Sequence, residues 1–579
     1  MKSLAVLDLH AKRNCADYQS SRRLAACITW LLVLALASGN LYARQPVYAR
    51  HAMVVAQEPH ATDVGVAVLK AGGNAIDAAV AVGFALAVTH PTAGNIGGGG
   101  FMIVRLANGH TAFLDFREAA PGHASHDMYL DAKGNATRDS IAGWRAPGVP
   151  GTVRGLEYAH KKFGHKSWSE LVDPAIKLAT EGFPVPYTMA ESLKPGSQST
   201  KLLSEFADSK RIFLGHAFGD KLIQAELAAT LTRIRNEGSH DFYEGETAHR
   251  LATAMKENGG LITLDDLKNY KVAEREPLTG KYRGYEIITS PPPSSGGIGL
   301  LQMLAMLEPT TYEKSGAGSA AEIHYVAEVE RRFYADRSEY LGDPDFFKNP
   351  IKKLLEPAYV TSRRASIDLN HASTSDQIRP GNIGPHESTE TTHYSVVDSD
   401  GNAVAVTYTL NGGYGSGVTA PGLGFLLNNE MDDFAAKPGS PNMFGLVQGE
   451  ANAIQPGKRP LSSMTPTIVL HDGKLFMTIG APGGSRIING VLEVFQNVVD
   501  FHMNPQDADD WPRFHHQWQP DKLYVEPGVS PDTIALLKSM GHNVEVTNGG
   551  VARVEVIVAK DGMLEGATDG RGSAKAAGY

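Results

Sequence analysis

The feature that most constrains the fold is a long stretch, Ala61 to Val88, in which alanine and aliphatic residues occupy most helical faces. A helix that is apolar on most faces is stable only where other elements cover it, so this stretch predicts a buried helix or helix pair. The pair Gly72-Gly73 predicts a break within it. A hairpin is predicted next, with strands Phe101–Leu106 and Ala112–Phe116 joined by a turn at Asn108-Gly109.

Helix and strand patterns are interleaved along the rest of the chain. Residues 155–270 have the amphipathic pattern of helices, and Ala320–Tyr340 predicts another helix. This interleaving predicts an α/β layered (α+β) domain with layers of both kinds. Further strands are predicted at Thr279–Thr289, His393–Val397, Asn402–Thr409, Thr465–Leu470, Leu475–Ile479, Val544–Thr547 and Val554–Val558, with a helix at Gly490–Val499.

Charge and cysteine usage exclude several classes of function. The net charge is -9, and no run of five or more Lys or Arg occurs, so the electrostatic footprint of a nucleic-acid-binding protein is lacking. The two cysteines, Cys15 and Cys27, both lie within the first 27 residues. If that region is removed, the mature protein has no disulfide, no cysteine metal site and no cysteine nucleophile.

The N-terminal segment has the pattern of a secretory signal. Arg22 and Arg23 precede an apolar run of 14 residues, Leu24 to Ala37, and small residues follow, with a possible cleavage point after Ala43. The run is short for a membrane span. We therefore predict a signal peptide over residues 1–43 and a periplasmic location, with a membrane anchor through residues 24–37 as the alternative.

Thr391 is the predicted nucleophile, although β-propensity alone explains a threonine that opens an edge strand. Its neighbours change that interpretation, because eight motifs occur in a specific order along the chain. They are GGNAIDAAVA (Gly72–Ala81), NIGGGGFM (Asn95–Met102), DFREAAP (Asp115–Pro121), PPPSSGG (Pro291–Gly297), TTHYSVVD (Thr391–Asp398), NNEMDDF (Asn428–Phe434), KRPLSSM (Lys458–Met464) and PGGSR (Pro482–Arg486).

Together these motifs resemble the γ-glutamyltranspeptidases (glutathione hydrolases), over nearly the whole mature chain. The resemblance implies an N-terminal nucleophile hydrolase fold, an αββα four-layer sandwich. It also implies a precursor that cuts itself before Thr391. Residues 44–390 then form the large subunit and residues 391–579 the small catalytic subunit, and the two make one αββα domain as a heterodimer.

The chemistry of Thr391 is consistent with this implication. A threonine hydroxyl is a poor nucleophile unless a base takes its proton. Cleavage of the Glu390–Thr391 bond frees an α-amine with a pKa of about 7.7–8.0, which can serve as that base. By resemblance, Thr409 hydrogen-bonds Thr391 and orients it. No metal or organic cofactor is expected.

The implied substrate end is a free amino acid, so its pocket needs groups of both signs. An arginine can grip a carboxylate with two parallel hydrogen bonds, hydroxyls can add donors, and carboxylates can accept from an ammonium. Without the resemblance, the same residues are explained as a surface arginine paired with Asp115 or Glu118, a serine cap and a solvated acidic turn. The predicted substrate-binding residues are Arg117, Asn411, Glu430, Asp433, Ser462 and Ser463.

Gly483 and Gly484 are the predicted oxyanion hole, because backbone N–H groups must approach the developing alkoxide without a side chain in the way. PGGSR lacks the spacing of a phosphate-binding loop. His515-His516 is a poor metal pair, because neighbouring residues on a strand point to opposite faces.

Three features depart from the family pattern, and one of them is the glycine pair in Asn411-Gly412-Gly413-Tyr414, where the family usually has bulkier residues. The other two are single positions. Phe444 lies in Pro438–Glu450, which resembles a lid loop, where the family often has a tyrosine bonded to the position of Asn411. Glu430 stands where several bacterial members carry glutamine. All three departures bear on acceptor preference and on the balance between hydrolysis and transfer.

The expected reaction forms a γ-glutamyl ester on Thr391 from glutathione or another γ-glutamyl compound, then passes it to water or to an acceptor amino acid or dipeptide. A β-lactam side-chain acylase or a poly-γ-glutamate transferase on the same scaffold is the first alternative. An uncleaved secreted binding protein is the second.

Overall fold

The computed structural model describes residues 44–379, 391–435, 437 and 450–579. Residues 46–579 form one compact unit built on two antiparallel sheets of seven strands each. The order in sheet I is β19 (Lys575–Gly578), β2 (Met53–Ala56), β10 (Thr392–Val397), β11 (Ala403–Thr409), β3 (Gly99–Arg105), β4 (Thr111–Phe116) and β7 (Ala273–Arg275). The order in sheet II is β1 (Val47–Ala49), β18 (Met563–Thr568), β17 (Glu555–Lys560), β13 (Lys474–Gly480), β12 (Thr467–His471), β9 (Tyr285–Thr289) and β8 (Leu278–Tyr282).

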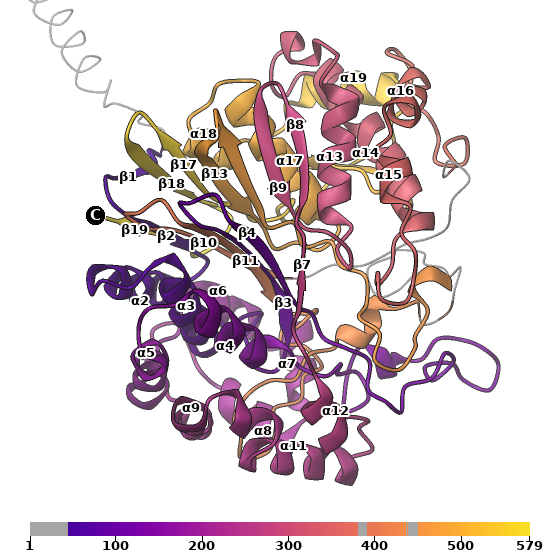
Figure 1. Cartoon of the computed structure of the whole chain (residues 1–579). Coiled ribbons are helices and arrows are strands. Elements are labelled where there is room, and N and C mark those ends of the chain that lie inside the picture. Colours follow the sequence, from indigo (N-terminus) through magenta and orange to yellow (C-terminus); the bar gives the residue numbers. More distant parts are fainter. Residues whose placement is uncertain (1–43, 380–390, 436, 438–449) are drawn as a thin grey trace, which may run out of the picture. The chain divides into compact units, whose positions relative to one another are not determined.

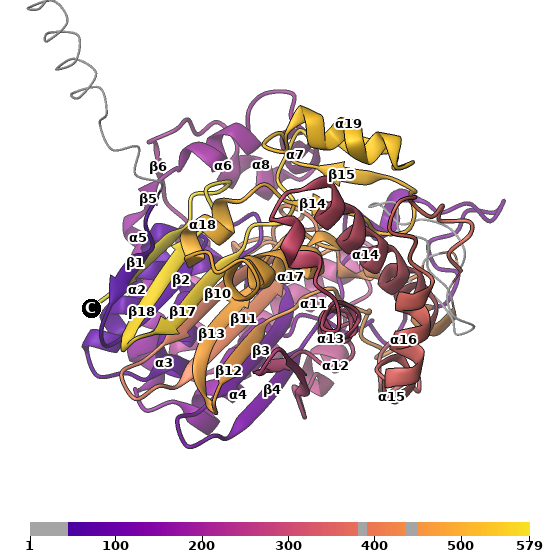
Figure 2. The same ribbon diagram turned by 90° about the horizontal axis from the view of Figure 1, so that it is seen from above.

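Helices cover the outer face of each sheet, so this unit has four layers (Figures 1 and 2). The αββα prediction is therefore confirmed. The helices over sheet I include α2 (Pro59–Lys70), α3 (Ala75–Thr89), α4 (Thr152–Phe163), α5 (Trp168–Glu181) and α9 (Ala225–Glu237). Those over sheet II include α13 (Gly296–Leu307), α14 (Ala320–Tyr340) and α17 (Arg486–Val499).

Shorter elements complete the described chain. A three-stranded sheet has the order β14 (Phe514–His515), β15 (Leu523–Val525) and β16 (Val544–Val546); β14 and β15 are antiparallel, and β15 and β16 are parallel. A separate two-stranded sheet pairs β5 (Phe183–Pro184) with β6 (Lys221–Leu222). The other helices are α6 (Tyr187–Ser192), α7 (Gln198–Ser204), α8 (Ala207–Phe213), α10 (Ser239–Tyr243), α11 (Glu246–Glu257), α12 (Leu264–Asn269), α15 (Ile351–Leu354), α16 (Pro357–Ala365), α18 (Pro505–Asp510) and α19 (Pro531–Ser539).

The side-chain alternation of β3 shows how sheet I joins two cores. Met102 and Val104 pack against the α2–α5 helices, whereas Phe101 and Ile103 face the core shared with sheet II. Successive residues of a strand point to opposite faces, so a strand covered on both sides is apolar throughout. All seven residues of β3 are buried for this reason.

The helix pair predicted from the early apolar stretch is α2 and α3, and the break at Gly72-Gly73 is confirmed. Gly72 has a φ of +86°, and Asn74 and Asp77 then form a reciprocal capping box at the start of α3. All 15 residues of α3 are buried, as its composition requires.

Other predicted elements are found within a few residues of their expected bounds, with two differences. Helix α17 begins at Arg486, four residues before the predicted start, so it directly follows Gly483-Gly484-Ser485. The prediction that Thr391 opens an edge strand was wrong, because β10 lies between β2 and β11 inside sheet I. Sequence pattern alone cannot distinguish an inner from an edge position in an antiparallel sheet covered on both faces.

Candidate active site

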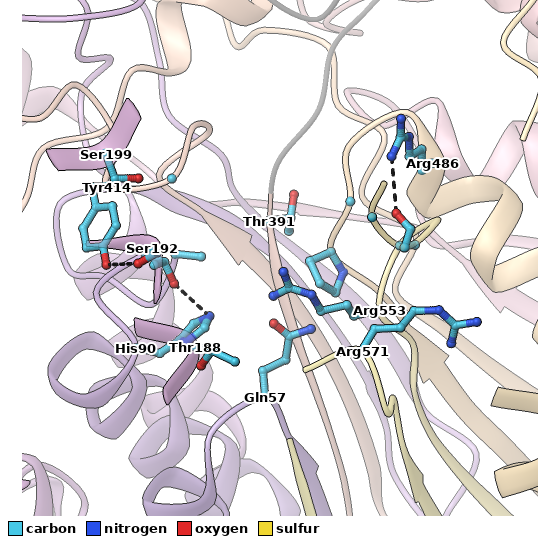
Figure 3. A pocket seen from close by; sticks show the side chains of 18 of the residues that line it. Gln57, His90, Thr188, Ser192, Ser199, Thr391, Tyr414, Arg486, Arg553 and Arg571 are labelled. Atoms are coloured by element: carbon cyan, nitrogen blue, oxygen red, sulfur yellow. Dashed lines mark hydrogen bonds between the residues drawn. The ribbon is translucent and has the colours of Figure 1, made fainter. Parts of the chain in front are cut away.

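Thr391 lies immediately before β10, at the end of the central part of sheet I, on the wall of a cavity of about 840 Å³ (Figure 3). Only 5% of the residue is exposed, and it is one of the residues that line this cavity. Gly483 also lines this cavity. The structure therefore brings together the predicted nucleophile and one predicted oxyanion donor, which are 92 positions apart in the sequence (483 − 391).

Thr409 is the last residue of β11, the strand beside β10. The pairing of Thr392 with Tyr408 places Thr409 across from Thr391 at the next position of the ladder. The Thr409 hydroxyl accepts a hydrogen bond of 2.7 Å from the backbone N–H of Asn411, whose side chain donates to the Asn429 carbonyl at 3.0 Å. Thr409 and Asn411 thus connect β11, the strand that pairs with β10, to the loop that carries Glu430.

The glycine pair between β13 and α17 has a backbone that other residues do not readily adopt. Gly483 and Gly484 have φ values of +131° and +64°. A Cβ added to Gly483 would lie 2.7 Å from Cα of Ala552, so a side chain has no room there. Because α17 begins at Arg486, N–H groups near the glycine pair belong to a helix N-terminus, where negative charge is favoured.

Arg117, Glu118, Glu430 and Asp433 form a buried group that we call the Arg117 cluster. The Arg117 guanidinium makes short ion pairs with Glu430 and Asp433, and its Nε donates to the Pro460 carbonyl at 3.2 Å. Glu118 Oε2 lies 3.9 Å from the same guanidinium. We expected Arg117 and Asp433 to contact opposite ends of a substrate, and here they pair directly with each other.

The two serines lie next to this cluster, and their hydroxyls also accept hydrogen bonds. The Ser463 hydroxyl accepts from Nη2 of Arg337 at 2.8 Å, and the Ser462 hydroxyl accepts from the Met464 N–H at 3.1 Å. Neither serine and no member of the Arg117 cluster lines the cavity at Thr391. The predicted site residues are thus divided between the cavity and a buried polar region.

The Arg117 cluster holds three carboxyl groups against one guanidinium, so it does not ionise completely. Burial raises the pKa of Glu118 to about 7, opposed by the Arg117 charge. Burial also raises the pKa of Glu430 well above its ordinary value, again opposed by Arg117, and the charges of Glu118 and Asp433 raise it further.

Several residues near the site were not predicted as site residues. Glu118 lies inside the DFREAAP motif, but its burial could not be deduced from a charged residue beside an arginine. Nothing in the local sequence around Arg337, on α14, marks it as a site residue. The same is true of three arginines that line the cavity: Arg486, Arg553 and Arg571.

Other predictions fall partly outside the described residues. Phe444, positions 438–449 of the predicted lid, Glu390 and the predicted signal segment all lie outside them. In the part of the chain that is described, no helix is long and apolar enough to cross a membrane. The same part contains no group of three or more metal-binding side chains, and His515 and His516 make separate contacts with Gln517 and Asp521.

Comparison with known proteins gives the family. The family model for γ-glutamyltranspeptidase matches residues 61–579. The chain belongs to the γ-glutamyltranspeptidase family. It is 51% identical to the glutathione hydrolase proenzyme of Escherichia coli (strain K12) over 91% of both chains, and 46% identical to that of Pseudomonas aeruginosa over 90% of this chain and 93% of the relative.

Solved structures agree with this assignment. The γ-glutamyltranspeptidase of Helicobacter pylori is 44% identical, with a TM-score of 0.55, and covers 59% of this chain and 97% of its own. A cephalosporin acylase from Bacillus halodurans is 28% identical, with a TM-score of 0.83, over 93% of this chain and 98% of its own. This family member is therefore an enzyme of the γ-glutamyltransferase and glutathione hydrolase type, as the eight motifs indicate.

Replacing Glu430 with glutamine should remove a pH-dependent loss of stability. The pKa of Glu430 is higher in the folded state than in the unfolded chain. As pH rises above about 4.5, the unfolded chain releases the Glu430 proton while the folded protein keeps it, so the free energy of unfolding falls until the folded-state pKa is reached. We expect Glu430→Gln to unfold at a higher temperature than wild type at about pH 8, with the difference shrinking towards about pH 4. Thermal melts across this range measure it, and a pH-independent difference would contradict the assignment.

Proposed function

We propose that this chain is a proenzyme that cleaves itself before Thr391 and then transfers the γ-glutamyl group of glutathione to water or to an amino acid or dipeptide. The observation that supports the proposal is that Thr391 and Gly483 both line one cavity of about 840 Å³. The same cavity is lined by the predicted nucleophile, by a glycine with a positive φ and by Arg486, the first residue of α17.

Self-cleavage and catalysis would use the same hydroxyl. Attack by Thr391 on the Glu390 carbonyl breaks the peptide bond, forms an ester and frees the α-amine. Water then opens the ester, leaving a Glu390 carboxylate and the restored hydroxyl. In the mature enzyme the freed amine takes the hydroxyl proton as the γ-glutamyl carbonyl is attacked. N–H groups at Gly483 and Gly484 would stabilise the oxyanion, and cysteinyl-glycine leaves with the proton.

The Arg117 cluster supplies the charges that a glutamyl α-carboxylate and α-ammonium require. Arg117 can pair with the carboxylate, assisted by Ser462 and Ser463, while Asp433 and Glu430 accept from the ammonium and Asn411 is a neutral partner. Oδ1 of Asp433 is buried and has no hydrogen-bond partner among the described residues. A substrate ammonium would donate a hydrogen bond to this oxygen. Substrate binding would therefore replace the Arg117–Asp433 ion pair with two new ion pairs, one between Arg117 and the substrate carboxylate and one between Asp433 and the substrate ammonium.

The two products of cleavage should remain one folded domain, because their strands are mixed in both sheets. In sheet I, β10 pairs with β2 and β11 pairs with β3. In sheet II, β1 pairs with β18 and β12 pairs with β9. Each of these pairs joins a strand from residues 44–390 to one from 391–579. Hydrogen-bonded ladders and a shared core would therefore hold the large and small subunits together as a heterodimer.

We further propose that the protein is exported and acts in the periplasm. The basic, apolar and small-residue pattern of residues 1–43 supports removal of a signal peptide. Retention through residues 24–37 is the alternative, and sequencing the N-terminus of the purified large fragment distinguishes the two.

The alternative substrate class is tested on one purified sample. The acylase similarity makes a glutaryl-cephalosporin a reasonable competitor, but that side chain lacks the α-ammonium that Asp433 would bind. We expect two bands on a denaturing gel, corresponding to fragments near residues 44–390 and 391–579, and at least about tenfold faster turnover of glutathione. A single band without γ-glutamyl amidase activity would contradict the proposal, and faster cephalosporin turnover would favour the acylase.

A further inference from the structure

The charged side chains that line the cavity at Thr391 are all basic in the described part of the chain. They are Arg486, Arg553 and Arg571, with no aspartate or glutamate among the lining residues. Arg571 is already neutralised, because it pairs with Glu526 and, at 3.1 Å, with Asp569. The other two arginines have no carboxylate partner among the described residues.

Arg553 and Arg486 differ in where their guanidinium groups lie. Arg486 donates to the Gly550 carbonyl at 3.3 Å and lies over the Tyr524 ring, 5.6 Å from its centroid. Arg553 is exposed, and Figure 3 shows its side chain directed towards Thr391 and Gln57, whereas Arg571 points away from them. Of the two arginines without a carboxylate partner among the described residues, Arg553 is the one whose side chain is directed towards the nucleophile (Figure 3).

The backbone of Arg553 is fixed against the glycine loop. Its N–H donates to the Pro482 carbonyl at 3.2 Å, and Ala552 packs on Gly483. His90, also on the cavity wall, is uncharged at working pH, because burial and then the Arg553 charge lower its pKa to about 4. Arg553 thus extends a positive charge into the cavity from a backbone position that is fixed beside the Gly483 loop.

We propose that Arg553 binds the terminal carboxylate of the peptide beyond the scissile bond, both in the leaving cysteinyl-glycine and in an incoming acceptor. This inference rests on the proposed function. Glutathione has two carboxylates, and the glutamyl one is assigned to the Arg117 cluster, no member of which lines the cavity. The rest of the substrate would then occupy the cavity, where the guanidinium of Arg553 can form paired hydrogen bonds to the glycine carboxylate.

Three donors that differ at the leaving group test this assignment. They are glutathione, glutathione whose glycine carboxyl is amidated, and γ-glutamyl-p-nitroanilide, whose leaving group has no carboxylate. We expect Arg553→Gln to raise KM for glutathione about three- to tenfold, a range set low because the side chain is exposed. The amide and the anilide should be unaffected. Glycylglycine should likewise lose effectiveness as an acceptor, whereas glycylglycinamide should not.

Two further variants make the result specific. Arg553→Lys keeps the charge and should retain part of the preference for the free carboxylate. Lys560→Gln removes one positive charge at the exposed end of β17 and should change nothing. If Arg553→Gln slows all three donors equally, or none, this inference is wrong while the proposed function stands. If wild type cleaves none of them, the proposed function itself fails.

Discussion

Thr391→Ala should remain a single uncleaved chain and should have no measurable γ-glutamyl amidase activity. In the proposed mechanism, the substitution removes the hydroxyl that attacks Glu390 during maturation and the substrate during catalysis, and it prevents release of the amine that would serve as base. Loss of a catalytic nucleophile lowers kcat by about 10⁶-fold in a well-studied hydrolase. A denaturing gel, N-terminal sequencing of any small fragment and a glutathione hydrolysis assay measure the three consequences.

Thr391→Ser is the matched control, because it keeps a hydroxyl and removes only a methyl group. We expect the serine variant to cleave its own chain before residue 391 more slowly than wild type does. Its γ-glutamyl amidase activity should be proportional to the fraction of chains that have been cleaved. Both variants should melt as cooperatively as the wild type, since Thr391 lies on a cavity wall and outside the apolar cores. Cleavage of the alanine variant before residue 391 would show that another group performs the maturation step.

Asp433→Asn should lower kcat/KM for glutathione by tens-fold or more. Its Oδ2 pairs with Arg117, and its buried Oδ1 is the acceptor that we assign to the substrate ammonium. A charge-assisted contact of this kind contributes about 1.5–3 kcal/mol, which corresponds to roughly 10- to 150-fold. Steady-state kinetics with glutathione measures the loss, and we expect much of it in KM.

Asp432→Asn provides a control at the neighbouring position with the same change in charge. The Asp432 carboxylate accepts from the Ser140 hydroxyl at 2.7 Å and belongs to the packing of the loop. We expect its kcat/KM to stay within about threefold of wild type. Equal losses in the two variants would mean that Asp433 acts through the fold of this loop and makes no separate contact with the ammonium.

Much of the local structure could be predicted because its causes are local. The all-round apolar composition of α3 requires burial, and the capping residues before it mark its start. The Asn108-Gly109 turn marks the hairpin of β3 and β4, where Gly109 has a φ of +91°. The motif containing Gly483 and Gly484 identifies a backbone that excludes side chains, and the positive φ values of both residues agree with it.

The contacts between motifs could not be predicted in the same way. Arg117 and Asp433 are 316 positions apart, and their direct pairing depends on how the loops after β4 and β11 meet. The raised pKa values of Glu118 and Glu430 follow from that burial and not from residue type. No sequence pattern marks Arg553, because the role that we propose for it rests on its position in the cavity and beside Pro482.

The sequence by itself determined that the chain belongs to the γ-glutamyltranspeptidase family, because eight ordered motifs specify the family and short-range rules specify the elements that carry them. Only the tertiary structure decided that β10 is an inner strand, that strands from both sides of residue 391 share each sheet, and that cavity and buried cluster are separate. Strand order and side-chain burial depend on contacts between residues hundreds of positions apart, which no local pattern encodes.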